Sequence, residues 1–231
     1  MAAMAESEIM QQAYSLYEGD TTDWASTDEE YLAARRYTKA AVQMWEFYDN
    51  TKWNELFTTL TAASDGTKTI TAGTFSYACP TDFRFPCSYV RTVQNSISSY
   101  YNVYKPDQIP ILDDSTGKWT YFIGSQKATY SLKFNPDLTL TTGDTINYEY
   151  YKTATYLTAT TSTTEMSNPF FIVHYILYRM YKNDGEDGKA REEFQIAQQL
   201  LEQMRVDNME GLWNTPFNIE ENSSIAGGFG R

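Results

Sequence analysis

The sequence is poor in the residues that most often carry catalysis and metal binding. It contains one histidine, His174, and two cysteines, Cys79 and Cys87, among 231 residues. Phosphate-binding loops of the form GxxxxGK[ST], the GxSxG turn and the HExxH zinc motif are all missing. A zinc site needs about four ligands, which one histidine and two thiols do not supply. We therefore expect no enzyme, no catalytic or cofactor-binding residues, no cofactor and no metal site, and we expect His174 to be a hydrogen-bonded core residue.

The two cysteines flank residues 80–86 and could close a small loop. One pair is no disulfide framework, and thiols usually stay reduced in a protein made in the cytosol. The first residues carry no basic group and lead into Glu6 and Glu8 without a long apolar stretch, so we expect cytosolic synthesis. Free structural thiols are the expectation, and a disulfide is the alternative.

No apolar run is long enough to cross a membrane. Residues 168–183 read NPFFIVHYILYRMYKN and include Arg179, whereas a transmembrane helix needs about 20 predominantly apolar residues. Asn168 and Pro169 are typical of the start of a helix. Because apolar side chains occupy every face, this helix is expected either at the centre of a helical bundle or against a neighbouring copy of the chain.

Positive charge is scarce as well. The chain has 18 Lys and Arg against 30 Asp and Glu, a formal net charge of −12. Proteins that hold nucleic acid usually grip its phosphates through a basic face. We therefore expect that DNA near this protein is not bound specifically.

Aromatic residues, in contrast, are abundant, with 19 Tyr, 12 Phe and 5 Trp. Aromatic side chains with a polar tip are enriched at protein contacts, which favours a component of an assembly. A tyrosine-rich core is an equally consistent interpretation.

Hydrophobic periodicity divides the chain into helical, strand and helical parts. Residues 6–18 have helical spacing, Thr27 with Glu30 forms a capping box for a second helix, and a shorter helical piece is expected over about 53–60. From about 67 to 160 the period changes to two, with turn signals between the runs, which predicts about six strands. A helical hairpin then follows.

We therefore predict an α+β fold with an inserted β lobe. Residues 1–66 and 168–207 are expected to form one helical bundle, and residues 67–167 a small antiparallel β-sandwich or barrel. Residues 208–231 are expected to form an extended C-terminal tail. Its apolar residues favour docking on a partner, with plain disorder as the alternative. These residues are Leu212, Trp213, Phe217, Ile219, Ile225 and Phe229.

Three stretches, and above all their order, resemble a known family. They are ACPTDFRFPCSYVRTV, the strands KATYSLKFNPDLTLTTGDTINYEYYK with a Gly-Asp turn between paired strands, and the hairpin NPFFIVHYILYRMYKNDGEDGKAREEFQIAQQLLEQM. Together they resemble the head-to-tail adaptor (connector) proteins of tailed bacteriophages, related to tail tubular protein A. The resemblance spans roughly residues 28–207.

The resemblance implies a structural virion protein at the head-tail junction, synthesised in the host cytoplasm. It implies a homo-oligomeric ring, usually a dodecamer, that binds the portal protein and the tail nozzle or tube protein. DNA passes through this ring during ejection without specific binding, and no membrane is involved. The helix residues Phe170, Phe171, Tyr175, Tyr178 and Arg179 are then candidates for inter-subunit or core contacts, and Glu192 and Glu193 are candidates for acids that face the lumen.

Two other functions stay open at this point. A non-enzymatic carbohydrate- or surface-binding β module of a virion or cell-surface assembly would use exposed Tyr and Trp side chains to stack on sugars. A small hydrolase would use dispersed carboxylates, but the sequence contains no recognisable catalytic pair.

Overall fold

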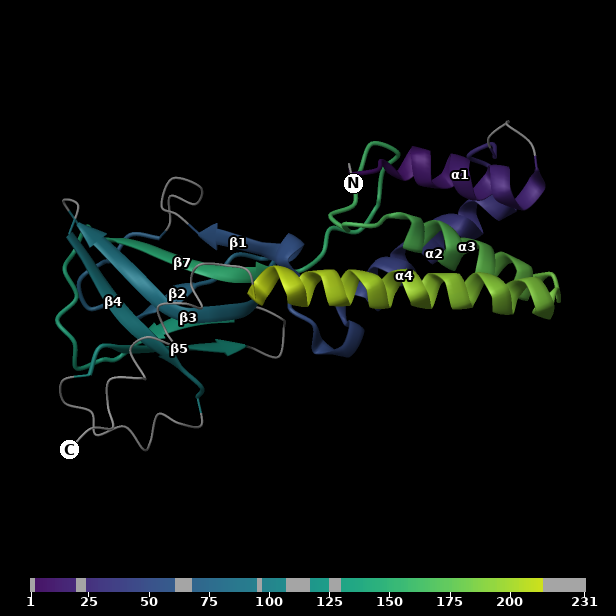
Figure 1. Ribbon diagram of the computed structural model, residues 1–231. Coiled ribbons are helices and arrows are strands. Elements are labelled where there is room, and N and C mark those ends of the chain that lie inside the picture. Colours follow the sequence, from purple (N-terminus) through teal and green to yellow (C-terminus); the bar gives the residue numbers. More distant parts are fainter. Residues whose placement is uncertain are drawn as a thin grey trace, which may run out of the picture. The chain divides into compact units, whose positions relative to one another are not determined.

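The chain contains four α-helices and one seven-stranded sheet in the residues that the computed structural model describes (Figure 1). The described residues are 3–19, 24–60, 68–94, 97–106, 117–124 and 130–213. Contacts divide the chain into two compact units, Met1–Glu55 with Ala154–Arg231 and Leu56–Thr153. The first unit holds the helices and the second holds the sheet.

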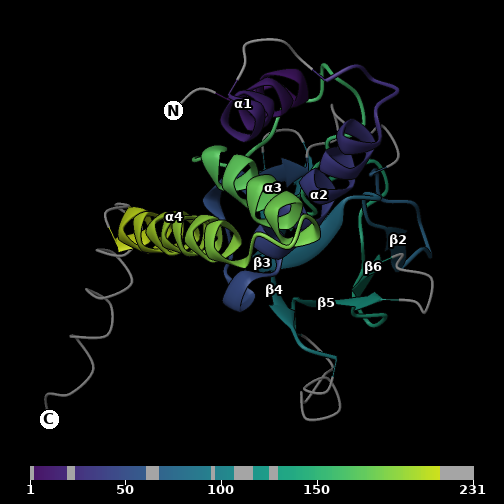
Figure 2. The same ribbon diagram turned by 90° about the vertical axis from the view of Figure 1, so that its right-hand side faces the viewer.

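The helical unit is built around α3. Its helices are α1 (Glu6–Glu18), α2 (Glu29–Glu46), α3 (Phe170–Asn183) and α4 (Asp187–Trp213). α3 contacts each of the other three helices (Figure 2). The buried residues of α3 are Phe171, Ile172, Val173, Tyr175, Ile176, Leu177, Met180 and Tyr181. The sequence left two ways to bury this apolar helix: helices of its own chain, or a neighbouring copy. Helices of its own chain bury it, so no neighbouring copy is needed.

Local signals predicted one helix start correctly and another wrongly. The backbone N–H of Phe170 donates to Oδ1 of Asn168 at 3.3 Å, as expected of a capping residue. The capping box at Thr27 is wrong, because α2 starts after Asp28. The Asp28 carboxylate accepts a hydrogen bond from the backbone N–H of Ala25 and so closes the preceding turn instead.

The chain reverses direction just after α2. In the 3₁₀ turn η1 (Tyr48–Asn50), Asp49 and Asn50 have φ of 47° and 52°, a left-handed conformation that Asn and Asp tolerate best among residues with a side chain. Trp53 then folds back on α2. Its indole N–H donates to the carbonyl oxygen of Trp45 at 2.8 Å, and the two rings stack with centroids 5.3 Å apart.

The helical piece expected over residues 53–60 is mostly a strand. Only η2 (Asn54–Leu56) is helical, and it is a single 3₁₀ turn. β1 (Phe57–Leu60) pairs antiparallel with residues 148–151 of β7. Phe and Thr have high strand propensity, and pairing with a long neighbouring strand outweighs the short helical pattern.

The second unit is a single curled sheet with strand order β1-β7-β3-β4-β5-β6-β2 (Figure 1). The remaining strands are β2 (Ser76–Ala78), β3 (Phe83–Gln94), β4 (Ile97–Tyr104), β5 (Trp119–Gly124), β6 (Tyr130–Phe134) and β7 (Thr145–Lys152). The sheet resembles half a barrel rather than a two-sheet sandwich. The prediction of purely antiparallel strands is wrong for β4 and β5, which pair in parallel. Their connection over residues 105–118 is long enough for the crossover that parallel strands need.

The strand pairing across the Gly-Asp turn also differs from the prediction. β6 pairs with β5 and β2, whereas β7 pairs with β3 and β1. Alternation of apolar and polar residues marks which face of a strand is buried, but it does not specify which strands are neighbours. The paired strands expected on either side of Gly143 are therefore wrong.

Aromatic rings fill the core of the sheet unit. Phe83 stacks on Phe122 and Tyr150 at centroid distances of 4.9 and 5.5 Å, and it meets Tyr148 edge-on at 6.2 Å. Offset and edge-on arrangements are the favourable geometries for such rings. The buried tyrosines of this core are Tyr77, Tyr101, Tyr148 and Tyr150. Much of the tyrosine excess in the strands is therefore core rather than exposed contact surface.

Candidate interaction surfaces

The described residues contain no arrangement typical of a metal centre. No group of three or more His, Cys, Asp or Glu side chains gathers there in a way that could hold an ion. None of the helices in these ranges combines the length and the apolar character that crossing a membrane requires. Candidate functional residues are therefore sought on surfaces that could meet other proteins.

The five α3 residues singled out in the sequence divide between core and partial exposure. Phe171 and Tyr175 are buried, whereas Phe170, Tyr178 and Arg179 are half-buried. The Arg179 guanidinium lies over the ring of Tyr37 from α2, 4.9 Å from its centroid. This cation–π contact joins α3 to α2. It also gives a partner to Arg179, the charged residue within the apolar sequence of α3. Contacts of these residues with another subunit stay a prediction.

The single histidine joins α3 to α4. Nδ1 of His174 lies 2.6 Å from Oε2 of Glu193, and each side chain is about one-fifth exposed. Glu193, one of the two acids expected to face a lumen, is thus engaged within its own chain. Glu192, the other, is exposed.

The predicted C-terminal tail begins later than expected. α4 continues to Trp213, so residues 208–213 are helical rather than extended. Asn208 is buried and fixes this end: its side-chain oxygen accepts from the backbone N–H of Asn54 at 2.7 Å, and its amide nitrogen donates to the carbonyl of Lys52 at 3.0 Å. Leu212 and Trp213 lie in the last turn of α4. The other predicted docking residues, Phe217, Ile219, Ile225 and Phe229, lie outside the described residues.

A surface that the sequence did not reveal lies where α2 faces the segment of residues 154–168, here called the strap. A groove of about 420 Å³ is lined by Leu32, Arg35, Arg36, Lys39 and residues 156–158. We call it the α2 groove. The spacing of these three basic residues in the sequence indicates only the polar side of an amphipathic helix. They line a groove only because the strap lies beside α2, and the hydrophobic periodicity of the sequence does not indicate where the strap lies.

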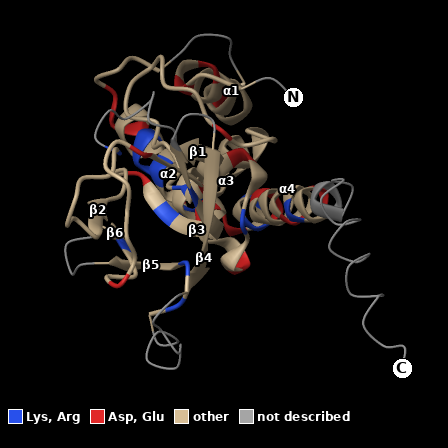
Figure 3. Ribbon diagram, turned by 90° about the vertical axis from the view of Figure 1, so that its left-hand side faces the viewer, with Lys and Arg blue, Asp and Glu red and all other residues tan. Residues whose placement is uncertain are grey.

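The charges of the α2 groove differ in their partners. Nε of Arg35 forms an ion pair at 2.9 Å with the fully buried Glu6 of α1, and the Arg35 guanidinium also donates to the carbonyl of Thr158. Nζ of Lys39 lies over the ring of Tyr156, 5.4 Å from the centroid. Within the described residues, neither Arg36 nor Lys39 has an acidic partner. Basic residues on α2 are visible in Figure 3.

The buried carboxylate of Glu6 marks a junction of three segments. The backbone N–H of Glu6 donates to the carbonyl of Ser162 at 2.8 Å, and that of Ser7 to the carbonyl of Thr160 at 3.2 Å. These bonds attach the start of α1 to the strap. Because Arg35 reaches the Glu6 carboxylate from α2, the pair holds α1, α2 and the strap together.

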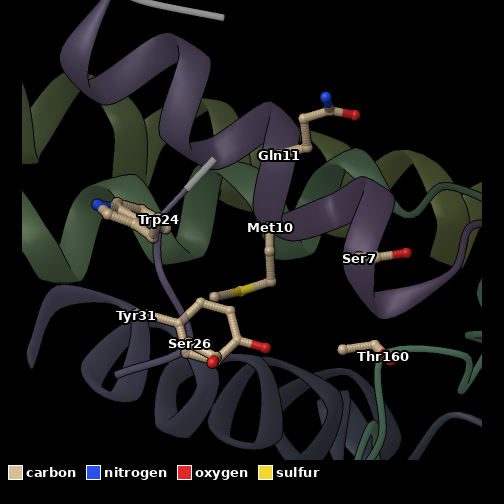
Figure 4. A pocket seen from close by; sticks show the side chains of 7 residues that line it. All are labelled: Ser7, Met10, Gln11, Trp24, Ser26, Tyr31 and Thr160. Carbon is tan, nitrogen blue, oxygen red and sulfur yellow. The ribbon is translucent and has the colours of Figure 1, made fainter. Parts of the chain in front are cut away.

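A second cavity lies at the same junction (Figure 4). It has a volume of about 210 Å³ and is lined by Ser7, Met10, Gln11, Trp24, Ser26, Tyr31 and Thr160. Met10 and Tyr31 point toward each other from α1 and α2 (Figure 4). The lining residues carry hydroxyl, amide, thioether and aromatic groups. None of them is Asp, Glu, His, Lys or Cys, the side chains that most often act as acid or base in catalysis.

Exposed apolar side chains occur on both units. In the sheet unit, Ile97 is 73% exposed and Tyr100 is 54% exposed. Tyr100 lies edge-on to Tyr89 on the adjacent strand β3, with centroids 5.6 Å apart. In the helical unit, Ile196, Val206 and Met209 are exposed on α4. Single exposed apolar residues are ordinary, but those on α4 and β4 are available for contacts with other proteins.

The pKa values of Cys79 and Tyr17 are the most strongly raised, and both shifts are caused mainly by burial. Burial raises the pKa of the Cys79 thiol to about 11. Burial, followed by the hydrogen bond to Asp184, raises the pKa of Tyr17 well above its usual value. Neither shift creates a nucleophile, because each favours the protonated form. Cys79 and Cys87 are both present as thiols and not as a disulfide, as expected.

Comparison with known proteins decides the family. A family model described as SU10 adaptor protein matches residues 4–219. The chain belongs to this family. It is therefore a phage adaptor-type protein, a structural component of the virion, and families of this kind are typically non-enzymatic. An adaptor role implies interaction with other phage head or tail proteins.

No curated protein was found to match the chain. The predicted relationship to tail tubular protein A has no support from the family match and stays a prediction.

Proposed function

We propose that this adaptor forms a homo-oligomeric ring at the head-tail junction, joins the portal protein to the tail nozzle or tube protein, and lines the channel for DNA. The family match over residues 4–219 is the observation that carries the proposal. A dodecamer is the copy number that the resemblance to head-to-tail connectors favours. Rings use heterologous contacts repeated by rotation, so each subunit needs two different contact surfaces.

The structure offers surfaces that suit this role. Exposed apolar residues on α4 and a basic groove on α2 lie in the same helical unit, on different helices. Because α3 is covered within its own chain, ring contacts are assigned to these outer surfaces instead. The half-buried residues Phe170, Tyr178 and Arg179 contribute at most the rim of such a contact.

The net charge of −12 suits a channel for DNA. An acidic lining repels phosphate, whereas a basic lining would release counterions and retain the DNA. Glu192 is the better candidate of the two predicted lumen acids, since Glu193 is engaged by His174. Glu192→Lys is expected to slow DNA ejection, measured as the rate of DNA release from purified virions. An unchanged rate would argue against a lumen position for Glu192.

The C-terminal segment is proposed to dock on a partner, either the portal or an adjacent subunit. Deleting residues 214–231 leaves the whole of α4 in place, including the contacts of Asn208. The truncated protein is expected to keep its helical content by circular dichroism and to lose most of its attachment to the portal in co-sedimentation. Attachment equal to that of the full chain would contradict docking on the portal.

The sugar-binding alternative is not favoured by the structure. Stacking on sugars requires exposed aromatic faces, but Tyr77, Tyr101, Tyr148 and Tyr150 of the sheet are buried. Tyr100 is exposed, but it lines neither the α2 groove nor the cavity beside Ser7.

A further inference from the structure

We infer that the α2 groove is the receptor for the C-terminal segment of a second copy of this chain, with Glu220 and Glu221 opposite Arg36 and Lys39. This inference deepens the proposed function and rests on it, because a second copy must lie beside the first. It names which surface of one subunit receives which segment of the next.

Charge is the first argument. In a chain of net charge −12, two subunits repel each other unless opposite charges meet locally. The α2 groove supplies such a place. Within the described residues, Arg36 and Lys39 are exposed and have no acidic partner, while Arg35 is already held by Glu6. Two basic groups are therefore available for an acidic ligand.

The chemistry of the segment is the second argument. Residues 217–221 read FNIEE, two apolar side chains followed by two adjacent acids. The groove presents a matching combination, because Leu32 is 43% exposed beside Arg36 and Lys39, which have no acidic partner within the described residues. Its volume of about 420 Å³ accommodates a few side chains. An apolar anchor next to paired opposite charges is a common mode of peptide recognition.

The position of the groove on α2 favours a second copy over the same chain. Tyr37 faces α3, where it contacts Arg179 and Asn183. Helical residues three or four positions apart share a face, so Leu32, Arg36 and Lys39 lie on one face of α2. Tyr37 is not three or four positions from any of them and lies on a different face.

The end of α4 contacts residues 48–54, which follow α2, and not the groove residues 32–39 of α2. α4, from which the segment leaves, packs mainly on α3. From an adjacent subunit, residues 214–219 can span roughly 20 Å when extended, which is enough to bridge a subunit boundary.

The test uses a fluorescein-labelled synthetic peptide of residues 214–231 and the full-length chain, with binding measured by fluorescence anisotropy. We expect saturable binding that weakens with salt, since exposed charges are screened. The double variant Arg36→Glu, Lys39→Glu is expected to bind about tenfold more weakly, because two exposed ion pairs are lost and replaced by repulsion between like charges. Lys118→Glu with Arg191→Glu changes the net charge equally at exposed sites away from the groove and should leave the affinity unchanged.

A charge exchange completes the experiment. The peptide with Glu220→Lys and Glu221→Lys should bind the unaltered chain weakly and the Arg36→Glu, Lys39→Glu chain with restored affinity. Circular dichroism of both protein variants checks that they are folded. Absence of saturable binding, equal affinity for the groove variant and its control, or failure of the exchanged peptide to recover binding would each overturn the inference.

The outcome is separable from that of the proposed function. Rings on the portal, seen by electron microscopy, combined with no peptide binding would overturn this inference alone. Peptide binding that follows the charge exchange, combined with no rings, would overturn the proposed ring and leave the receptor groove standing.

Discussion

At the scale of single residues, the carboxylate of Glu6 is buried in the helical unit and needs a compensating charge. Glu6 is fully buried, and its ion pair with Arg35 compensates a charge that water no longer solvates. The Arg35 side chain itself is 36% exposed, but its removal leaves the buried Glu6 charge without compensation.

Arg35→Met should therefore destabilise the protein strongly. We expect a loss of about 3 kcal/mol in the free energy of unfolding. Arg36→Met is the matched control, since it removes the same charge from the next position, where the side chain is exposed, and should cost less than about 0.5 kcal/mol. Urea unfolding followed by circular dichroism measures both. Equal effects of the two substitutions would show that the Glu6 pair does not hold the junction.

The Cys79 thiol should lose its proton only at a pH above the usual range for a cysteine. Its pKa of about 11 lies above the ordinary value of 9.0, so the folded state retains the proton that an unfolded chain releases. The stability linked to this group is complete below pH 9 and is lost as the pH rises from 9 toward 11.

Alkylation measures this shift directly. In a Cys87→Ser background, the iodoacetamide rate at Cys79 should keep rising with pH up to about 11. In urea the same thiol should level off near its ordinary pKa, since the thiolate is the reactive form. A native profile that levels off near pH 9 would contradict the burial of this thiol.

At the scale of elements, α3 determines the stability of the helical unit. Ile176 is fully buried in α3, whereas Ile196 on α4 is 37% exposed. Ile176→Ala should cost about 3 kcal/mol through lost burial and the cavity left behind. Ile196→Ala, the same substitution on another helix, should cost less than about 1 kcal/mol. Thermal or urea unfolding compares them.

The cover of α3 also determines what the isolated chain does. If α3 depended on a neighbouring copy, both alanine variants and the unaltered chain would unfold at midpoints that rise with protein concentration. Cover by α1, α2 and α4 of the same chain predicts midpoints that do not change with concentration. A clear rise would mean that the helical unit is completed only by a second subunit.

Elements differ in how far the sequence predicts them. The amphipathic stripe of residues 6–18 and the glycine after it are local signals, and they predict the first helix with the bounds observed for α1. β1 was missed because its four residues are decided by pairing with β7. The parallel pair β4–β5 was missed for the same reason, since a strand's sequence encodes its buried face but not its neighbour.

The candidate surfaces were predicted less well than the elements. Glu193 looked like a free acid because nothing in its own helix shows that His174 lies opposite. The α2 groove needs α2 and the strap, which are more than a hundred residues apart in the chain. Apolar content alone marked α3 as important, yet it did not distinguish a core helix from a contact surface.

At the scale of the whole molecule, family and charge lead to one account. A structural adaptor with a net charge of −12 and a covered central helix needs outer surfaces for its partners. In the proposed ring these are the α2 groove, the exposed side of α4 and the C-terminal segment. No catalytic step is required of any of them.

Electron microscopy of the purified protein, mixed with the portal and tail proteins of the same virion, tests this account most directly. The account predicts closed rings with a central channel, seated on the portal, and rotational averaging of the images would give their copy number. Single chains that stay unattached at concentrations where portal and tail proteins are both in excess would contradict it.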